Sequence, residues 1–215
     1  MDPFVLCSQI RPFSCSDRIL DIGCGCGIIP VILGYCFPQT RITGVEIQKE
    51  LAEIAMKNII ANKLGHTVSI INEDIKQFKL KSANNPFDQI LANPPYEKRN
   101  TGRVNPDLQK AIARHELTMD IKTLAAKAET LLRPRGRFII IFPSKRLADI
   151  EQAVKATSIY PEWIRFIHTG QKKTPKRVIF SGRKETPAQR RILPPIYLSP
   201  DNMADMNILP GRIYP

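Results

Sequence analysis

Short apolar segments alternate with helical segments along most of this 215-residue chain, and this alternation restricts the fold more than any other feature. The apolar segments have the length of strands, whereas the segments between them repeat apolar residues at helical spacing. Strands joined through helices form right-handed crossovers in a parallel sheet, so the sequence predicts a doubly wound α/β fold. Expected strands cover residues 18–22, 41–46, 68–71, 87–92, 136–142, 162–167 and 177–181; expected helices cover residues 2–10, 28–37, 50–62, 119–132 and 147–156.

The end of the chain departs from this alternation. Only a short linker around residues 170–176 separates the last two expected strands, which favours an antiparallel hairpin. A proline-rich stretch begins at Pro187, and residues 192–197 are expected to pack as an irregular strap. We therefore expect seven strands in a single domain, residues 1–198, followed by a tail, residues 199–215.

The composition is that of an ordinary globular protein, with 43% hydrophobic and 24% charged residues. No apolar run reaches the roughly 20 residues of a membrane span, and the first residues lack the basic region of a secretory signal. Five cysteines bunched near the N-terminus do not resemble a disulfide framework. Cys24 and Cys26 could suggest a metal, but no second Cys or His pair follows at zinc spacing. We expect a cytoplasmic protein with no metal and no membrane contact.

Positive charge is concentrated in one part of the chain. Residues 133–191 carry 15 Lys and Arg against 4 Asp and Glu, which accounts for most of the net charge of +12. A basic region on an otherwise near-neutral chain is typical of a protein that binds nucleic acid. The alternative is charge that only favours solubility. Within this region we expect Lys172, Lys173, Lys176 and Arg177 to contact phosphates.

A glycine-rich loop follows the first expected strand. Gly23, Gly25 and Gly27 form a G-x-G-x-G pattern before a helix, which brings backbone N–H groups close to a ligand. A dinucleotide-binding loop has the pattern G-x-G-x-x-G, and Ile28 stands where its third glycine belongs. The loop therefore indicates a nucleotide-like ligand but disfavours NAD.

An acid stands at the end of each of the first three expected strands. Asp21 is placed to accept from a ligand ammonium, Glu46 to accept from both ribose hydroxyls, and Asp74 to accept from an exocyclic amine. S-adenosylmethionine fits this set because it is a nucleoside with a cationic amino-acid tail and no pyrophosphate. The alternative for each acid is an N-cap on the following helix, which accounts for Asp74 better than for Asp21.

Residues 93–96, Asn-Pro-Pro-Tyr, follow the fourth expected strand. The two prolines fix φ, so the carbonyl groups of Asn93 and Pro94 are held in set directions. The Asn93 amide oxygen adds an acceptor and Tyr96 adds a flat ring. Two acceptors beside a ring would suit a planar group that carries an NH2, such as adenine, cytosine, guanine or a carboxamide. The alternative is a proline-rich turn with a half-buried tyrosine.

Several motifs together resemble a known enzyme class. Residues 21–27, 44–46 and 93–96 resemble the class I S-adenosylmethionine-dependent methyltransferases that modify conjugated nitrogens. More narrowly, residues 44–48, 113–117 and 191–195 resemble the bacterial tRNA adenine-N6 methyltransferases that act on valine tRNA. The resemblance implies a Rossmann-like, mostly parallel sheet of order 3-2-1-4-5-7-6, with strand 7 antiparallel and helices on both faces. It also implies tRNA as partner.

The resemblance further implies roles for individual residues. Family members begin earlier than the position of Asp2, so either this sequence starts inside the protein or the N-terminal lid over the methionine end of the cofactor is shortened. Arg114 and His115 are implied to contact RNA, although a helix cap or a pair within a helix accounts for them as well. The implied catalytic residues are Asn93, Pro94 and Tyr96, and the implied cofactor residues are Asp21, Gly23, Gly25, Gly27, Glu46, Ile47, Asp74, Ile75 and Asn93.

Three other functions remain open at this point. Methyltransferases of the glutamine amide in release factors use the same Asn-Pro-Pro-Tyr logic, although they usually carry an extra N-terminal helical domain. Adenine methylation of ribosomal RNA or DNA is a second alternative. The third is an RNA-binding protein without catalysis on the same fold, which the intact glycine loop and Asn-Pro-Pro-Tyr motif disfavour.

Overall fold

The computed structural model describes residues 1–14, 16–80, 86–94, 121–170, 173–187 and 189–198. The described helices are α1 (Asp2–Cys7), α2 (Ile28–Cys36), α3 (Lys49–Ala61), α5 (Ile121–Leu131), the 3-10 turn η1 (Ser144–Arg146) and α6 (Leu147–Val154). The strands are β1 (Arg18–Ile22), β2 (Arg41–Glu46), β3 (Val68–Asn72), β4 (Phe87–Ala92), β5 (Leu132–Pro143), β6 (Ile159–His168), β7 (Arg177–Lys184) and β8 (Arg191–Tyr197).

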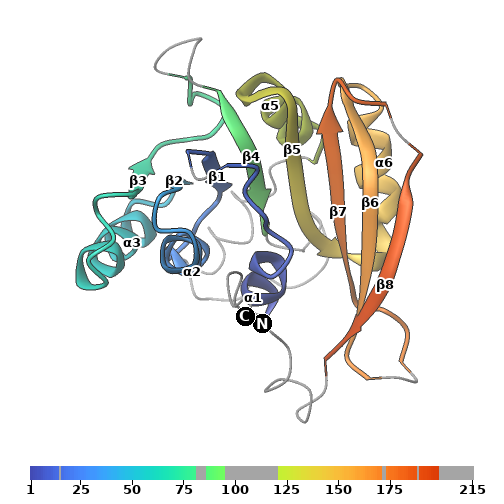
Figure 1. The fold of residues 1–215 in the computed structure, drawn as a ribbon, viewed down its shortest axis with the longest axis horizontal. Coiled ribbons are helices and arrows are strands. Elements are labelled where there is room, and N and C mark those ends of the chain that lie inside the picture. The colour runs from blue at the N-terminus through green and yellow to red at the C-terminus, as the bar shows by residue number, and fades with distance from the viewer. Residues whose placement is uncertain (15, 81–85, 95–120, 171–172, 188, 199–215) are drawn as a thin grey trace, which may run out of the picture.

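All eight strands belong to one sheet, in the order β3-β2-β1-β4-β5-β7-β6-β8 (Figure 1). The first five strands pair in parallel, and β7 is antiparallel to both β5 and β6. The predicted α/β class, the order 3-2-1-4-5-7-6 and the C-terminal hairpin are therefore confirmed. Because β1 to β5 all run the same way, their carboxyl ends meet at a single edge of the sheet, where ligands bind in folds of this type.

The eighth strand corrects the expectation of an irregular strap over residues 192–197. β8 pairs in parallel with β6, with a register shift between Arg165 and Ile167. Pro194 and Pro195 cannot donate to a ladder, so they sit at this irregularity on the sheet edge, where prolines are tolerated. The Arg165 side chain supplies a replacement bond, since its Nε donates to the Pro194 carbonyl at 2.8 Å. β8 thereby covers the row of backbone groups that β6 would otherwise expose.

Strand β5 is also longer than predicted, since it begins at Leu132 rather than at Gly136. The chain passes from α5 directly into the strand, and the register to β4 shifts between Phe87 and Gln89. Gly136 is needed at this irregular junction, because a Cβ there would lie 2.8 Å from the Arg133 carbonyl oxygen. Pro134 lies in this register shift, between Leu132 and Arg137, which pair with Phe87 and Gln89 of β4 on either side of it.

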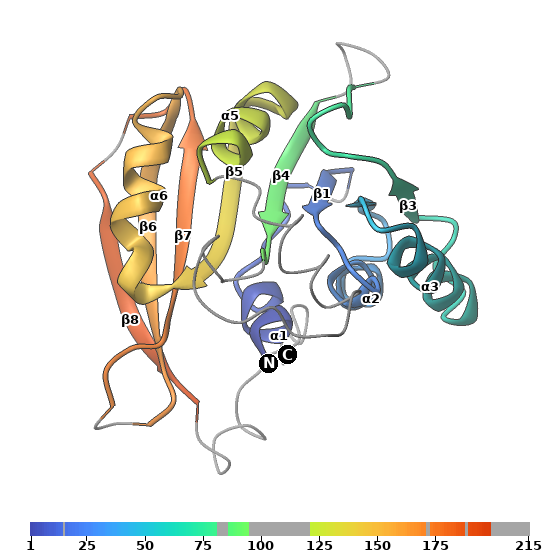
Figure 2. The same ribbon diagram turned by 180° about the vertical axis from the view of Figure 1, so that it is seen from behind.

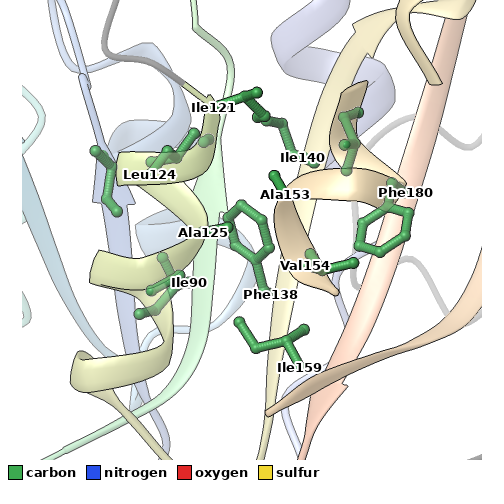
Figure 3. Packing of buried hydrophobic residues seen from close by; sticks show 14 of the residues in the cluster. Ile90, Ile121, Leu124, Ala125, Phe138, Ile140, Ala153, Val154, Ile159 and Phe180 are labelled. Atoms are coloured by element: carbon green, nitrogen blue, oxygen red, sulfur yellow. The ribbon is translucent and has the colours of Figure 1, made fainter. Parts of the chain in front are cut away.

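The helices cover both faces of the sheet and bury two apolar clusters (Figures 1 and 2). Residues of α1, α2 and α3 pack in one cluster, and residues of α5 and α6 pack in the other. Figure 3 shows Phe138 of β5 between the small side chains of Ala125 on α5 and Ala153 on α6. This close packing fixes β4 and β5, and therefore fixes the position from which Asn93 leaves the sheet.

The described residues give two further findings. No helix among them is both long enough and apolar enough to cross a membrane. In the same part of the chain, no three His, Cys, Asp or Glu side chains are grouped so that they could hold a metal ion.

Candidate active site

The glycine loop and the Asn-Pro-Pro-Tyr motif leave the sheet from adjacent strands at the same level. Ile22 at the end of β1 pairs with Val45 of β2 and with Ala92 of β4. The next residue along β1 is Gly23, and the next residue along β4 is Asn93. The sequence placed both motifs after a strand, but only the strand order makes those strands neighbours.

The glycine loop adopts a backbone that favours glycine at three positions. Gly23, Gly25 and Gly27 have φ of 72°, 55° and 83°, in the left-handed region that side chains with a Cβ rarely occupy. The N–H groups of Gly23 and Cys24 donate to the Val45 carbonyl at 2.8 and 3.1 Å. The loop is therefore tied to β2 and turns sharply before α2 begins.

Glu46 connects the glycine loop to the chain after β2. Its carboxylate is almost fully buried, at 2% exposure. Oε2 accepts the Gly25 N–H and Oε1 accepts the Gln48 N–H, both at 2.9 Å. A carboxylate has about four acceptor positions, so these bonds leave capacity for ribose hydroxyls. Glu46 thus has a structural task at the loop in addition to the role predicted for it.

Gly44 allows the loop to approach β2 closely. A Cβ at this position would lie 2.8 Å from both the Cys24 Sγ and the Ile70 Cδ1. We expect Gly44→Ala to cost about 1–3 kcal/mol of folding free energy and to weaken S-adenosylmethionine binding, because the loop must move away. Thermal unfolding and calorimetric titration check both effects. Gly65→Ala is the matched control, since a Cβ at Gly65 would meet no heavy atom within 4 Å.

Asp21 is a buried acid without a hydrogen-bond partner. Its side chain is fully buried, and neither Oδ1 nor Oδ2 has a partner among the described residues. Burial, followed by the nearby charge of Glu46, raises the pKa of Asp21 to about 8. Unsatisfied buried carboxyl oxygens are costly, and they mark a place where a donor or a cation is missing. The ammonium of S-adenosylmethionine fits this requirement.

The third strand contributes residues that were predicted and one that was not. Asp74 is half-buried, and its Oδ1 accepts the Lys76 N–H at 2.9 Å. Asp74 therefore caps a turn, which partly agrees with the N-cap alternative. The Ile75 side chain packs in the core. Sequence reasoning missed Asn72, whose Nδ2 donates to the carbonyls of Glu46 and Ile47 at 2.9 and 3.1 Å. Its position beside the acid at a strand end was the available signal.

The predicted catalytic residues fall at the limit of the described chain. Asn93 and Pro94 follow β4 and are half-buried. Tyr96 lies outside the described residues, as does the preceding Pro95. The placement of Asn93 therefore rests on the register of β4 with β1 and on the packing that fixes β4.

The residues predicted to contact RNA do not all lie on a free surface. Lys173 and Lys176 are exposed between β6 and β7, at the carboxyl edge that carries Asn93. Arg177 instead forms an ion pair with Asp2 of α1, with Nε 2.9 Å from Oδ2. Arg114, His115 and Lys172 lie outside the described residues.

Several arginines in the basic region serve the fold. Arg137 and Arg183 both bind Glu162, and Arg133 binds Asp88. The same three guanidinium groups surround the Phe13 ring, at 4.9–5.4 Å from its centroid. Counting charges therefore overstates the surface available to RNA. An exposed basic residue that sequence reasoning did not single out is Lys145, which follows β5 at the carboxyl edge.

The comparisons with known proteins agree with this architecture. Residues 14–183 match the family described as "Methyltransferase domain". A tRNA1(Val) (adenine(37)-N6)-methyltransferase from Porphyromonas gingivalis is 35% identical over 172 residues, which span 79% of this chain and 67% of that protein. A protein of the same name from a Flavobacteriaceae bacterium is 27% identical over 190 residues, covering 87% of this chain and 79% of its own length.

A solved structure shares the fold at low sequence identity. A predicted O-methyltransferase from Agrobacterium tumefaciens superposes with a TM-score of 0.73 and 18% identity, over 95% of this chain and 96% of that one. The family match and the 35% identical relative show that this protein belongs to the S-adenosylmethionine-dependent methyltransferases, in the family whose relatives are named tRNA1(Val) (adenine(37)-N6)-methyltransferase.

Proposed function

We propose that this methyltransferase transfers a methyl group to the N6 atom of an adenine in tRNA, in the cytoplasm. The observation that carries the proposal is the register of β1, β2 and β4, which brings Asn93 beside the glycine loop. The relatives' names support adenine N6 of tRNA as the target, because a 35% identical relative bears that activity in its name. The exposed lysines at the same edge support an RNA partner.

In this proposal the chain holds the cofactor through three acids and a loop. Bound S-adenosylmethionine supplies an electrophilic methyl group. Asp21 balances the ammonium, Glu46 accepts from the ribose hydroxyls, and Asp74 with the backbone of Ile75 binds the adenine ring. Ile47, at 40% exposure, offers apolar surface to that ring. The two Asp21 oxygens support this assignment, since no residue in the described part of the chain donates to them.

Asn93 and Pro94 act on the target amine. The lone pair of an adenine N6 is delocalised into the ring, which makes the nitrogen a poor nucleophile. When the Asn93 side-chain oxygen and the Pro94 carbonyl each accept one N6–H, they favour a tetrahedral nitrogen and stabilise the positive charge that develops on it. The lone pair then points towards the methyl group, so the N–CH3 bond forms as the S–CH3 bond breaks. S-adenosylhomocysteine is the leaving group, and the extra proton leaves to water after transfer.

The remaining contacts position the RNA. Tyr96 stacks on the target adenine, which must leave its neighbours in the RNA to reach the site. Lys172, Lys173 and Lys176 bind phosphates, and Arg114 and His115 also contact the RNA. Residues 1–198 form one domain in this proposal.

Mass-spectrometric nucleoside analysis of tRNA tests the proposal. Purified tRNA from a strain lacking the protein is compared with tRNA from its parent. The parent should contain N6-methyladenosine that the deletion strain lacks and that the reintroduced gene restores. Unchanged nucleosides together with a lost methyl group on a release-factor glutamine would favour the alternative amide substrate instead.

A further inference from the structure

An aromatic pair stands at the carboxyl ends of β6 and β8. His168 and Tyr197 are paired in the sheet register, so their side chains lie on the same face. Their ring centroids are 5.0 Å apart and their planes are inclined by 34°. Alternation along β6 places His168 on the same face as Ile164 and Phe166, which pack with α6. Both aromatic side chains are half-buried and end the layer on this face.

Local hydrogen bonds hold this pair firmly. The His168 Nδ1 lies 2.7 Å from the Lys173 carbonyl oxygen. Because a carbonyl can only accept, Nδ1 carries the proton in this contact. The Leu198 N–H donates to the His168 carbonyl at 2.7 Å, which fixes the chain just after Tyr197. The His168 ring and the backbone after Tyr197 are therefore set before any ligand arrives, and the Tyr197 ring packs on the His168 ring, which reduces the entropy cost of stacking against it.

Three lysines lie at the same edge of the sheet as the pair. Lys173 and Lys176 lie in the chain that leads from β6 to β7, and Lys145 follows β5. The Ser144 N–H donates to the Lys176 carbonyl at 3.2 Å, so these two segments touch. The three lysine side chains are exposed, and none forms an ion pair within the described residues. In this they differ from the arginines at the opposite edge, which are bound to Asp88 and Glu162.

The pair lies at a useful distance from Asn93. Strand order places β6 three positions from β4, and β8 four positions from it. At about 4.8 Å per strand, these strands lie about 14 and 19 Å to the side of β4. The register puts Ala92 level with Ile164, so His168 and Tyr197 lie four residues, or about 13 Å, further along the strand direction. The pair is therefore about 20 and 23 Å from the end of β4. Stacked nucleotides advance about 3.4 Å each, so the span corresponds to about six to seven nucleotides. An RNA that presents one base to Asn93 can reach the pair with a nucleotide several positions away.

We propose that Tyr197, supported by His168, forms a second stacking platform for a tRNA base several nucleotides from the target adenine. Lys145, Lys173 and Lys176 bind the phosphates between the two bases. The platform rests on the proposed function, and it adds a specificity surface outside the catalytic motif. An aromatic ring together with lysines fits single-stranded RNA, which is recognised by stacking and by phosphate contacts.

Substitution of Tyr197 separates stacking from simple edge packing. Tyr197→Leu keeps apolar bulk but removes the flat ring, and Tyr197→Phe keeps the ring. We expect Tyr197→Leu to weaken tRNA binding by about 5- to 100-fold, with Tyr197→Phe close to wild type. Tyr160→Ala is the matched control, because Tyr160 is a 39% exposed tyrosine at the other end of β6. Binding of S-adenosylmethionine should not change in any of the three variants.

The salt dependence of tRNA binding distinguishes the lysines from the ring. Replacing Lys173 and Lys176 with alanine should flatten the slope of log affinity against log salt, whereas Tyr197→Leu should leave the slope unchanged. Equal tRNA affinity for wild type and Tyr197→Leu, with similar thermal stability, would overturn the platform. Failure of the wild-type protein to methylate tRNA would instead overturn the proposed function, so the two failures are distinguishable.

Discussion

Replacing Asn93 with alanine is expected to lower the rate of methyl transfer by about 100- to 1,000-fold or more, with little change in S-adenosylmethionine affinity. The side-chain oxygen is one of two acceptors that we assign to the N6–H groups. Its loss leaves the amine planar and its developing charge unsupported. The cofactor contacts come mainly from the ends of β1 and β2, and the register of those strands does not depend on the Asn93 side chain.

Single-turnover methylation of unmodified tRNA measures the first effect, and calorimetric titration with S-adenosylmethionine measures the second. Asn93→Asp is the informative companion, because it keeps an acceptor oxygen at the same place. It should retain more activity than the alanine variant. If Asn93→Ala methylates tRNA at the wild-type rate, the side chain has no part in the reaction.

Asp21→Asn is expected to stabilise the fold while weakening S-adenosylmethionine binding. The pKa of Asp21 is raised to about 8 from the ordinary value of 3.8, chiefly by burial and then by Glu46. Between these values the folded protein holds a proton that the unfolded chain has released. Stability therefore falls as pH rises from about 4 to 8. Asparagine removes this titration, so the variant should gain most at pH 8 and little near pH 4.

Thermal unfolding from pH 4 to 8.5 tests the stability effect, with an expected gain of several degrees at the alkaline end. Titration of S-adenosylmethionine in two buffers of different ionisation enthalpy tests the binding effect. At pH 7 the wild-type protein should release close to one proton per ligand, because the ammonium favours the ionised carboxylate. If Asp21→Asn binds S-adenosylmethionine as tightly as wild type and releases the same number of protons, Asp21 has no part in the cofactor site.

Local patterns predicted the parts of the fold that are governed locally. The strands before the glycine loop and before Asn93 are short apolar runs, and their ends were found from the polar residues that follow. The left-handed backbone at Gly23, Gly25 and Gly27 was likewise implied by residue type. These features depend on neighbours in sequence, so they are visible without the structure.

Other features depend on partners distant in sequence and could not be predicted. Pro194 and Pro195 suggested an irregular strap, whereas the open edge of β6 recruits that segment as a strand. Arg177 looked like a phosphate ligand by charge, but Asp2, far away at the N-terminus, binds it. The bonds from Glu46 to the glycine loop depend in the same way on the pairing of β1 with β2.

Methylation of unmodified tRNA by the purified protein with methyl-labelled S-adenosylmethionine tests the central claim most directly. The label is located by nucleoside mass spectrometry, with a release factor offered in a parallel reaction. The account predicts label on adenine N6 in tRNA, with the Asn93→Ala protein giving almost none. Label on the glutamine amide alone, on a different atom of the RNA, or at equal yield with Asn93→Ala would contradict it.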